Sequence, residues 1–532
     1  WQGTSSLQYV LKNFTARLKD ENMAVYDYTP YPNGILEDTY CFKCDYMEST
    51  HSRNAGIAKF VNECLYDTKN PAQLLNSNIR NTINGFPAVM YINDELQGIY
   101  NFNLDRYSTK SFGYTDEDKV LVYEISANSD TTAGAFYSWT EASGKNESAY
   151  YQSDFECLYP PTRAAGNDSL TELKRLIEWV DKSSDEDFKD NIGRYFNVEY
   201  LLRYYLFVLV FGAVDSLGKN AKLASFDGGL TWYFQVYDAD TTCGLNNSGF
   251  LLFGTDIEMG DENTFNTTGS RLWQRVIYLF QDELKAQYAL MRQGRFTVDN
   301  IMKYLYGEQI SQIPATYYNI DMQRKYLDFG SSYLYALHGS GEKHLKKWIR
   351  ERLMYVDTLL GYMVSSSDYI TLRSNKLGYV YLDIQMYIPM YVTVKWRDEA
   401  GGTGIQTKRV GKNETVRFEY NMPTATDQEI LVYAGHYIKS LGDLSNLQPS
   451  TLLIANANRL TEITCHSPHL INTDLSECTL LQKIDISGCS VLGTGIGAQP
   501  ILNIQKAKYL RYLDTKDTQL TAIYTMQTGS NL

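Results

Sequence analysis

The spacing of apolar residues over the first 365 residues of the chain favours strands and helices in turn. Residues 1–20 predict short strands with a change of face near Lys12, which leaves Lys12 on a strand. Residues 86–105 predict a hairpin that turns at Asn93-Asp94. Residues 107–165 are rich in small polar residues and predict a loop-rich insertion. Helical spacing recurs over 53–65, 169–181, 198–211, 271–291, 298–305 and 342–363. Together these segments predict an α+β fold.

The pattern changes after Ser365. Apolar and polar residues alternate in segments joined by glycine turns, which predicts a small β-sandwich-like module over 366–435. Over 436–532, similar short motifs begin at Leu460, Leu470, Leu481 and Leu510. The third motif and its neighbours fit L-x-x-L-x-L-x-x-N/C, so this segment resembles a leucine-rich repeat solenoid, whose strands bury their leucines by stacking. The open face of such a solenoid is a natural surface for a protein or glycan ligand.

Composition narrows the functional classes. The 532 residues include 62 acidic and 49 basic side chains, a net charge of −13. General nucleic-acid binding relies on clustered Lys and Arg, so we expect no nucleic-acid partner. The 44 tyrosines suit protein interfaces, although Tyr-rich strands in an ordinary core explain them nearly as well. The longest apolar run, 204–214, is too short to cross a bilayer, so we expect no transmembrane segment.

The 8 cysteines are even in number but sparse, and they lack the regular spacing of a disulfide-rich scaffold. Cys41-Phe-Lys-Cys44 is a single C-x-x-C segment without a second pair. Two small buried residues at the end of a strand explain it better than a zinc site does. We therefore expect no structural metal.

The most informative chemistry lies between residues 215 and 240. Asp215 follows the apolar segment 198–211, Asn220 completes a D-x-x-x-x-N spacing, and Asp238 and Asp240 come after a predicted hairpin. A phosphoryl-transfer site needs one carboxylate that accepts the proton of the acceptor hydroxyl. It also needs an amide oxygen and one or two carboxylates that hold magnesium. Asp and Asn are also common in turns because their side chains hydrogen-bond to the nearby backbone. The spacing alone therefore does not distinguish a catalytic site from ordinary turns.

Around these residues the chain resembles the spore coat protein H (CotH) kinase-like family. The similar segments are 200–207, 214–216, 219–222 and 232–240, together with Gly3-Thr-Ser-Ser6, Lys12-Asn13, 43–54, 89–100 and 348–359. The resemblance covers about residues 1–365 and implies an atypical, secreted or surface protein kinase. It implies two lobes, a small one over about 1–106 and a large one over about 166–365. Because the similar segments begin within the first six residues, we expect the natural chain to extend before Trp1.

The resemblance also implies a role for each candidate residue. Asp215 would be the catalytic base, and Lys12 would contact the phosphates of ATP, with Lys43 and Arg53 as alternative phosphate partners. The residues that would hold Mg²⁺ are Asn220, Asp238 and Asp240. Ser49 or Thr50 can cap the helix over 53–65, and either Glu63 on that helix or Glu48 before it would orient Lys12.

Two functions remain from this reading. The first is an atypical kinase that transfers the γ-phosphate of ATP to a Ser or Thr of a surface or particle protein. The alternative is a non-catalytic structural or adhesive protein of a phage virion or bacterial surface, in which the kinase-like domain is a scaffold and the repeats bind a partner. Both place the protein outside the cell, on a cell surface or on a virion, with a protein substrate or assembly partner.

Overall fold

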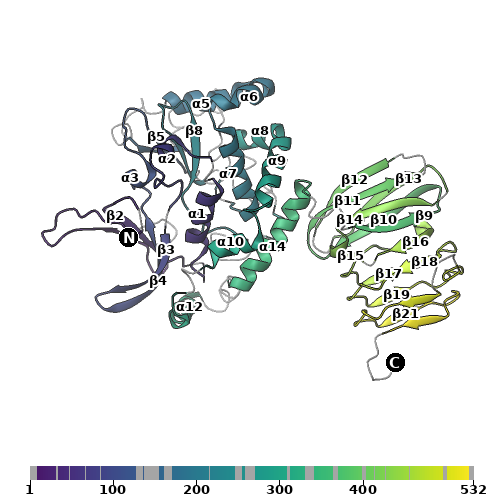
Figure 1. Cartoon of the computed structure of the whole chain (residues 1–532). Coiled ribbons are helices and arrows are strands. Elements are labelled where there is room, and N and C mark those ends of the chain that lie inside the picture. Colours follow the sequence, from purple (N-terminus) through teal and green to yellow (C-terminus); the bar gives the residue numbers. More distant parts are fainter. Residues whose placement is uncertain are drawn as a thin grey trace. The chain divides into compact units, whose positions relative to one another are not determined.

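The computed structural model divides the chain into two compact units, Trp1–Leu353 and Met354–Leu532. It describes residues 9–31, 34–46, 48, 50–65, 68–83, 85–126, 136, 155–160, 171–214, 216–217, 219–245, 254–257, 270–307, 312–329, 341–362, 369–397, 403–411, 414–425, 427–454, 456–494 and 500–525. Among these residues, no helix combines the length and the apolar character that a membrane span requires. Figure 1 shows the elements of both units.

The first sheet is antiparallel, with strand order β1-β2-β4-β3. Its strands are β1 (Phe14–Arg17), β2 (Thr39–Lys43), β3 (Gly85–Ile92) and β4 (Glu95–Leu104). The hairpin predicted at Asn93-Asp94 is confirmed, and these residues have φ values of 51° and 65°, in the left-handed region that a type I′ turn needs.

Lys12 precedes β1 and does not lie on a strand, so the prediction that placed it on one is wrong. The ladder between β1 and β2 begins at Phe14 and Phe42. Beyond it, the side-chain oxygen of Asn13 accepts the N–H of Cys44 in place of a backbone carbonyl, at 2.9 Å. Regular strand pairing therefore stops before Lys12.

The second sheet has the order β6-β5-β7-β8. Its strands are β5 (Leu121–Ser126), β6 (Phe155–Tyr159), β7 (Lys219–Ser225) and β8 (Trp232–Val236), with the short helix α3 (Thr109–Phe112) before them. The expected loop-rich insertion over 107–165 thus supplies two strands. Residues 120–123 are all buried, so they show no alternation of apolar and polar positions by which a strand could be found.

Helix α1 (Arg53–Cys64) contacts β3 on one side and α7 on the other (Figure 1). The predicted helix over 198–211 is observed as α7 (Val198–Phe211). It is buried over nearly all of its length and ends at Gly212 with φ 56°. The predicted helix over 271–291 is divided at Phe280, whose backbone leaves the helical region with φ −113° and ψ 31°.

The remaining helices of the first unit follow in chain order. They are α2 (Pro71–Leu75), α5 (Thr171–Lys182), α6 (Asp185–Asn191), the 3₁₀ helix η4 (Ile192–Arg194), α8 (Arg271–Leu279), α9 (Gln281–Arg292), α10 (Val298–Leu305), α12 (Ala315–Phe329) and α14 (Glu342–Leu359). Helix α12 was not predicted from the sequence, and the boundary between the two units falls inside α14.

The second unit begins with two facing groups of strands. They are β9 (Tyr369–Ser374), β10 (Gly378–Met386), β11 (Met390–Arg397), β12 (Thr403–Val410), β13 (Val416–Met422), β14 (Gln428–Tyr433), β15 (Ile438–Ser440) and β16 (Pro449–Leu453), with the 3₁₀ helices η6 (Gly435–Tyr437) and η7 (Leu444–Leu447). The sheet orders are β13-β10-β15 and β12-β11-β14-β9-β16-β18, in which β18 spans Asn472–Asp474. Alternate residues such as Val380, Leu382, Val392 and Val394 are buried in one core.

A β-solenoid of about three turns completes the chain. Its strands are β17 (Glu462–Thr464), β18 (Asn472–Asp474), β19 (Lys483–Asp485), β20 (Ile501–Asn503), β21 (Tyr512–Asp514) and β22 (Ala522–Tyr524). In one parallel ladder Ile463 pairs with Ile484, and Ile484 with Leu513. The predicted repetition is therefore observed as a solenoid, whereas its assignment to the leucine-rich repeats stays a prediction.

Candidate functional site

Asp238 lies just after β8, and its carboxylate meets the ammonium group of Lys43 at the end of β2. Lys43 Nζ is 2.8 Å from Asp238 Oδ2, and the two side chains are 10% and 21% exposed. The same ammonium lies 4.7 Å from the centre of the Tyr237 ring. The ion pair therefore joins the ends of two strands from different sheets at a partly buried position.

Asn54, in the first turn of α1, holds Asp238 from another side. Its Nδ2 donates to Asp238 Oδ1 at 2.9 Å, and its Oδ1 accepts from the N–H of Ala239 at 3.2 Å. Asn54 is only 1% exposed. Both the Nδ2 and the Oδ1 of Asn54 are therefore hydrogen-bonded, and Asn54 holds the carboxylate of Asp238 in position.

Glu48 and Arg53 attach the start of α1 to the segment that follows Asp238. Glu48 Oε2 accepts from the N–H groups of Ser52 at 2.8 Å and Arg53 at 3.3 Å, so a carboxylate caps the helix where a hydroxyl was expected. Arg53 Nη1 lies 2.7 Å from Glu48 Oε1, and Arg53 Nε donates to the carbonyl of Thr242 at 3.1 Å. The position of α1 is therefore coupled to the loop that carries Asp238.

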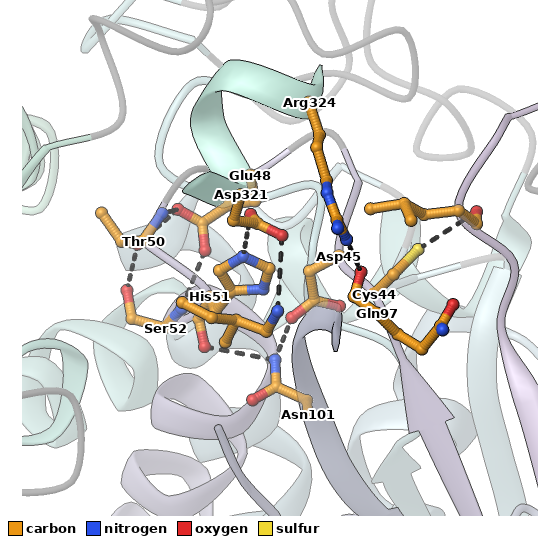
Figure 2. Close-up of polar contacts among 12 residues, drawn as sticks. Cys44, Asp45, Glu48, Thr50, His51, Ser52, Gln97, Asn101, Asp321 and Arg324 are labelled. Atoms are coloured by element: carbon orange, nitrogen blue, oxygen red, sulfur yellow. Dashed lines mark hydrogen bonds and ion pairs between the residues drawn. The ribbon is translucent and has the colours of Figure 1, made fainter. Parts of the chain in front are cut away.

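A buried polar network lies next to this helix start (Figure 2). His51 Nε2 and Asp321 Oδ2 of α12 are 2.7 Å apart, with side chains 0% and 1% exposed. Asn101 of β4 donates to the carboxylate of Asp45 and, at 3.2 Å, to the carbonyl of His51. Arg324 of α12 donates to the carbonyls of Leu96 and Gln97. These contacts fasten α12 to β4 and to the segment that leads into α1.

Lys43 and Asp45 both have shifted pKa values. Burial lowers the pKa of the Lys43 ammonium, but its ion pair with Asp238 and the nearby Tyr237 and Asp240 together raise it well above its ordinary value. Lys43 is therefore protonated at neutral pH. Burial raises the pKa of the Asp45 carboxyl to about 6, with His51 acting to lower it and Glu48 to raise it.

A second buried lysine, Lys222 of β7, contacts the Tyr237 ring at 5.5 Å and the Phe112 ring at 4.0 Å. Its ammonium donates to the carbonyl of Arg106 at 2.6 Å. Burial lowers the pKa of Lys222 to about 7, against the opposing effect of Glu124. Tyr237 thus has a lysine near it from each of the two sheets.

The structure brings some of the expected site residues together. The N–H of Tyr237 donates to the carbonyl of Asn220 at 3.1 Å, so Asn220 of β7 lies beside the residue that precedes Asp238. Asp240 is near enough to Lys43 to raise its pKa. Asp215 lies outside the described residues, between Val214 and Ser216, which are 3% and 1% exposed.

The three expected phosphate partners lie in different surroundings. The ammonium of Lys12 donates to the carbonyl of Tyr9, and the lysine paired with Asp238 is Lys43. The guanidinium of Arg53 is fully buried between Glu48 and Thr242. Glu63, one of the two candidates to orient Lys12, is exposed on α1. Lys43 is thus the expected phosphate partner that the structure places at Asp238.

Carboxylate oxygens are ligands that Mg²⁺ prefers, and the two oxygens of Asp238 are paired with Lys43 and Asn54. Within the described ranges, no group of three or more His, Cys, Asp or Glu side chains is arranged to hold one metal ion. Near Asp238, the described residues include two further oxygen donors that were expected from the sequence, Asp240 and Asn220.

No role was predicted from the sequence for Asn54, His51 or Asp321. Asn54 lies within the family-like segment 43–54 and directly follows Arg53, so its position was available as a signal. His51 and Asp321 are separated by 270 residues, and the sequence around either residue does not predict their contact.

Comparison with known proteins identifies the first unit. No curated protein matches the chain. A family model described as CotH kinase protein matches residues 5–356, which include both sheets, α1 and the Lys43–Asp238 pair. The resemblance drawn from the sequence is confirmed at the level of the family, and the chain belongs to the CotH kinase family.

Proposed function

We propose that the first unit is an atypical protein kinase that transfers the γ-phosphate of ATP to a Ser or Thr hydroxyl of a protein. The observation that carries this proposal is the contact of 2.8 Å between Lys43 and Asp238. Phosphoryl transfer needs a positive group that binds phosphate and a carboxylate that binds the metal. Lys43 and Asp238 supply these two groups where the two sheets meet. Membership of the CotH kinase family supports the same assignment.

In this proposal each residue has one task. Lys43 binds the phosphates of ATP through the ammonium group at the end of its flexible side chain. Asp238, with Asp240 and Asn220 near it, holds Mg²⁺. When bound, the cation neutralises the charge of the triphosphate. Asp215 accepts the proton of the acceptor hydroxyl. Arg53 keeps α1 and the loop after Asp238 together, because its guanidinium is engaged by Glu48 and Thr242.

We assign partner binding to the second unit. A solenoid presents consecutive strands as one extended surface, which suits a protein or glycan ligand. A kinase joined to such a unit would act on a surface or particle protein that the second unit brings close. We therefore propose that the protein lies outside the cell, on a cell surface or on a virion.

Calorimetric titration with Mg²⁺ and a non-hydrolysable ATP analogue tests the proposal. We expect the wild type to bind the analogue and Lys43→Met to bind it at least tenfold more weakly, because a charge-assisted phosphate contact is lost. Lys110→Met is the control, since Lys110 pairs with the exposed carboxylate of Asp27. Absence of binding by the folded wild type would contradict the proposal, as would equal affinities of the Lys43 and Lys110 variants.

The alternative is a structural or adhesive protein that keeps this fold as a scaffold. It is favoured by one observation, since Lys43 and Asn54 already satisfy both oxygens of Asp238 without any ligand. Transfer of labelled phosphate from ATP separates the two functions. A kinase loses transfer on Asp215→Asn while its Tm stays nearly unchanged, whereas a scaffold shows no transfer to begin with.

A further inference from the structure

The two oxygens of Asp238 have different partners. Oδ2 lies 2.8 Å from the ammonium of Lys43, and Oδ1 accepts a hydrogen bond of 2.9 Å from Asn54. A divalent cation bound to Oδ2 would stand beside the ammonium, and like charges at such a separation repel each other strongly. Cation binding at Asp238 is therefore weakened for as long as Lys43 stays in place.

The two partners also differ in how firmly they are held. Asn54 is fixed by α1, is 1% exposed, and receives a second hydrogen bond from the N–H of Ala239. Lys43 is itself only 8% exposed, but it reaches Asp238 through a flexible stem of four carbons, and a phosphate nearby attracts its charge. Lys43 is thus the partner that can be exchanged, whereas Asn54 stays in place.

We propose that Asn54 is a positioning residue that fixes Oδ1 of Asp238 and leaves Oδ2 to be exchanged between Lys43 and a divalent cation. Lys43 moves from Oδ2 to a phosphate group when a nucleotide binds, and Oδ2 then becomes available to the cation. Nucleotide and cation therefore bind with positive cooperativity, and each raises the affinity of the other by the same factor. This inference rests on the proposed function and adds the order in which the site fills.

The test is the affinity for Mn²⁺, measured by calorimetry on the full chain without nucleotide. We expect Lys43→Met to bind Mn²⁺ at least tenfold more tightly than the wild type, because the repelling ammonium is gone. Adding Asn54→Ala to Lys43→Met should weaken Mn²⁺ binding severalfold, because Asp238 loses the amide that positions it.

Asn62→Ala is the matched control, since Asn62 lies on the same helix. Its Nδ2 donates to Thr82 at 2.7 Å and its Oδ1 accepts from the N–H of Asn81 at 3.2 Å, so it makes the same kinds of contact away from Asp238. Added to Lys43→Met, it should leave the Mn²⁺ affinity unchanged. Equal losses in the two double variants would show that Asn54 acts only through stability, and the Tm of each variant is measured alongside.

A second measurement uses the wild type with a saturating non-hydrolysable ATP analogue, corrected for Mn²⁺ held by free analogue. We expect at least a tenfold gain in Mn²⁺ affinity. If the analogue binds but the gain is absent, the cooperativity is contradicted while the proposed function stands. If the analogue does not bind, the proposed function fails, and the comparison of Lys43→Met with the wild type in Mn²⁺ alone still decides whether Lys43 obstructs Oδ2.

Discussion

The carboxyl group of Asp45 is buried beside the side chains of His51, Glu48 and Lys43. Burial raises its pKa from 3.8 to about 6. A raised pKa means that the folded state binds the proton more tightly than the unfolded state does. The resulting stabilisation is present below pH 4 and is lost as the pH rises through about 6. Asp45 is therefore a group whose ionisation opposes folding at neutral pH.

The substitution Asp45→Asn should remove this dependence, because an amide does not titrate and still accepts the hydrogen bond from Asn101. Relative to the variant, the wild type should lose about 2 to 3 kcal/mol of unfolding free energy between pH 4 and pH 7. Urea denaturation at several pH values measures the difference. Asp282→Asn, at an exposed side chain, is the control and should follow the wild type. Parallel pH profiles of Asp45→Asn and the wild type would contradict the prediction.

Among the helices, α7 shows how a local signal sets an element boundary. Asn197 caps its start by accepting the N–H of Tyr200 at 3.0 Å, and Gly212 ends it in the left-handed conformation with φ 56°. A Cβ atom added to Gly212 would lie 3.2 Å from the ring of Trp348. The turn that leads from α7 towards Asp215 therefore requires glycine for its backbone conformation and also has little space for a side chain.

Gly212→Ala should lower the free energy of unfolding by about 1 to 2 kcal/mol, because alanine is strained in this conformation. Gly193→Ala is the control, since no atom lies within 4 Å of an added Cβ there and Gly193 belongs to η4. That change should alter stability by less than about 0.5 kcal/mol. Denaturant unfolding of both variants checks the prediction, and equal losses would show that the conformation of Gly212 is not the cause.

The protein as a whole consists of two units that each bury their own apolar residues. Strands of the sandwich and the solenoid share one core, which runs from Ile370 to Ile504. The first unit contains separate clusters, one around Tyr40 and Val122 and another around Leu11 and Tyr100. Units with separate cores are expected to unfold in separate transitions.

Scanning calorimetry should therefore resolve two transitions that respond to different changes. Ile484→Ala, at a fully buried position of the solenoid, should lower one transition through a loss of about 3 kcal/mol. Mg²⁺ with the ATP analogue should raise only the other. Ile523→Ala is the control, because Ile523 is 37% exposed and should cost much less. If Ile484→Ala moved both transitions equally, the two units would not be thermodynamically separate.

Prediction from the sequence succeeded where neighbours along the chain carry the information. The hairpin at Asn93-Asp94 and helices α7 and α10 were placed correctly, because turn chemistry and helical spacing are local. Strand β5 was missed because Leu121 and its neighbours are buried on both faces and show no alternation. Lys12 was placed on a strand because its neighbours alternate, yet pairing with β2 stops before it.

The site shows the same division. The order of Asp215, Asn220 and Asp238, together with the segment that contains Lys43 and Arg53, pointed to phosphoryl transfer and to the family. The sequence left Lys12, Lys43 and Arg53 as alternatives for phosphate and gave Asn54 no role. Folding places Lys43 and Asn54 at Asp238, from positions 195 and 184 residues away along the chain. Local sequence patterns specify helices and hairpins because the interactions that form these elements act between residues close along the chain. Contacts between distant segments exist only once sheets and helices have packed together.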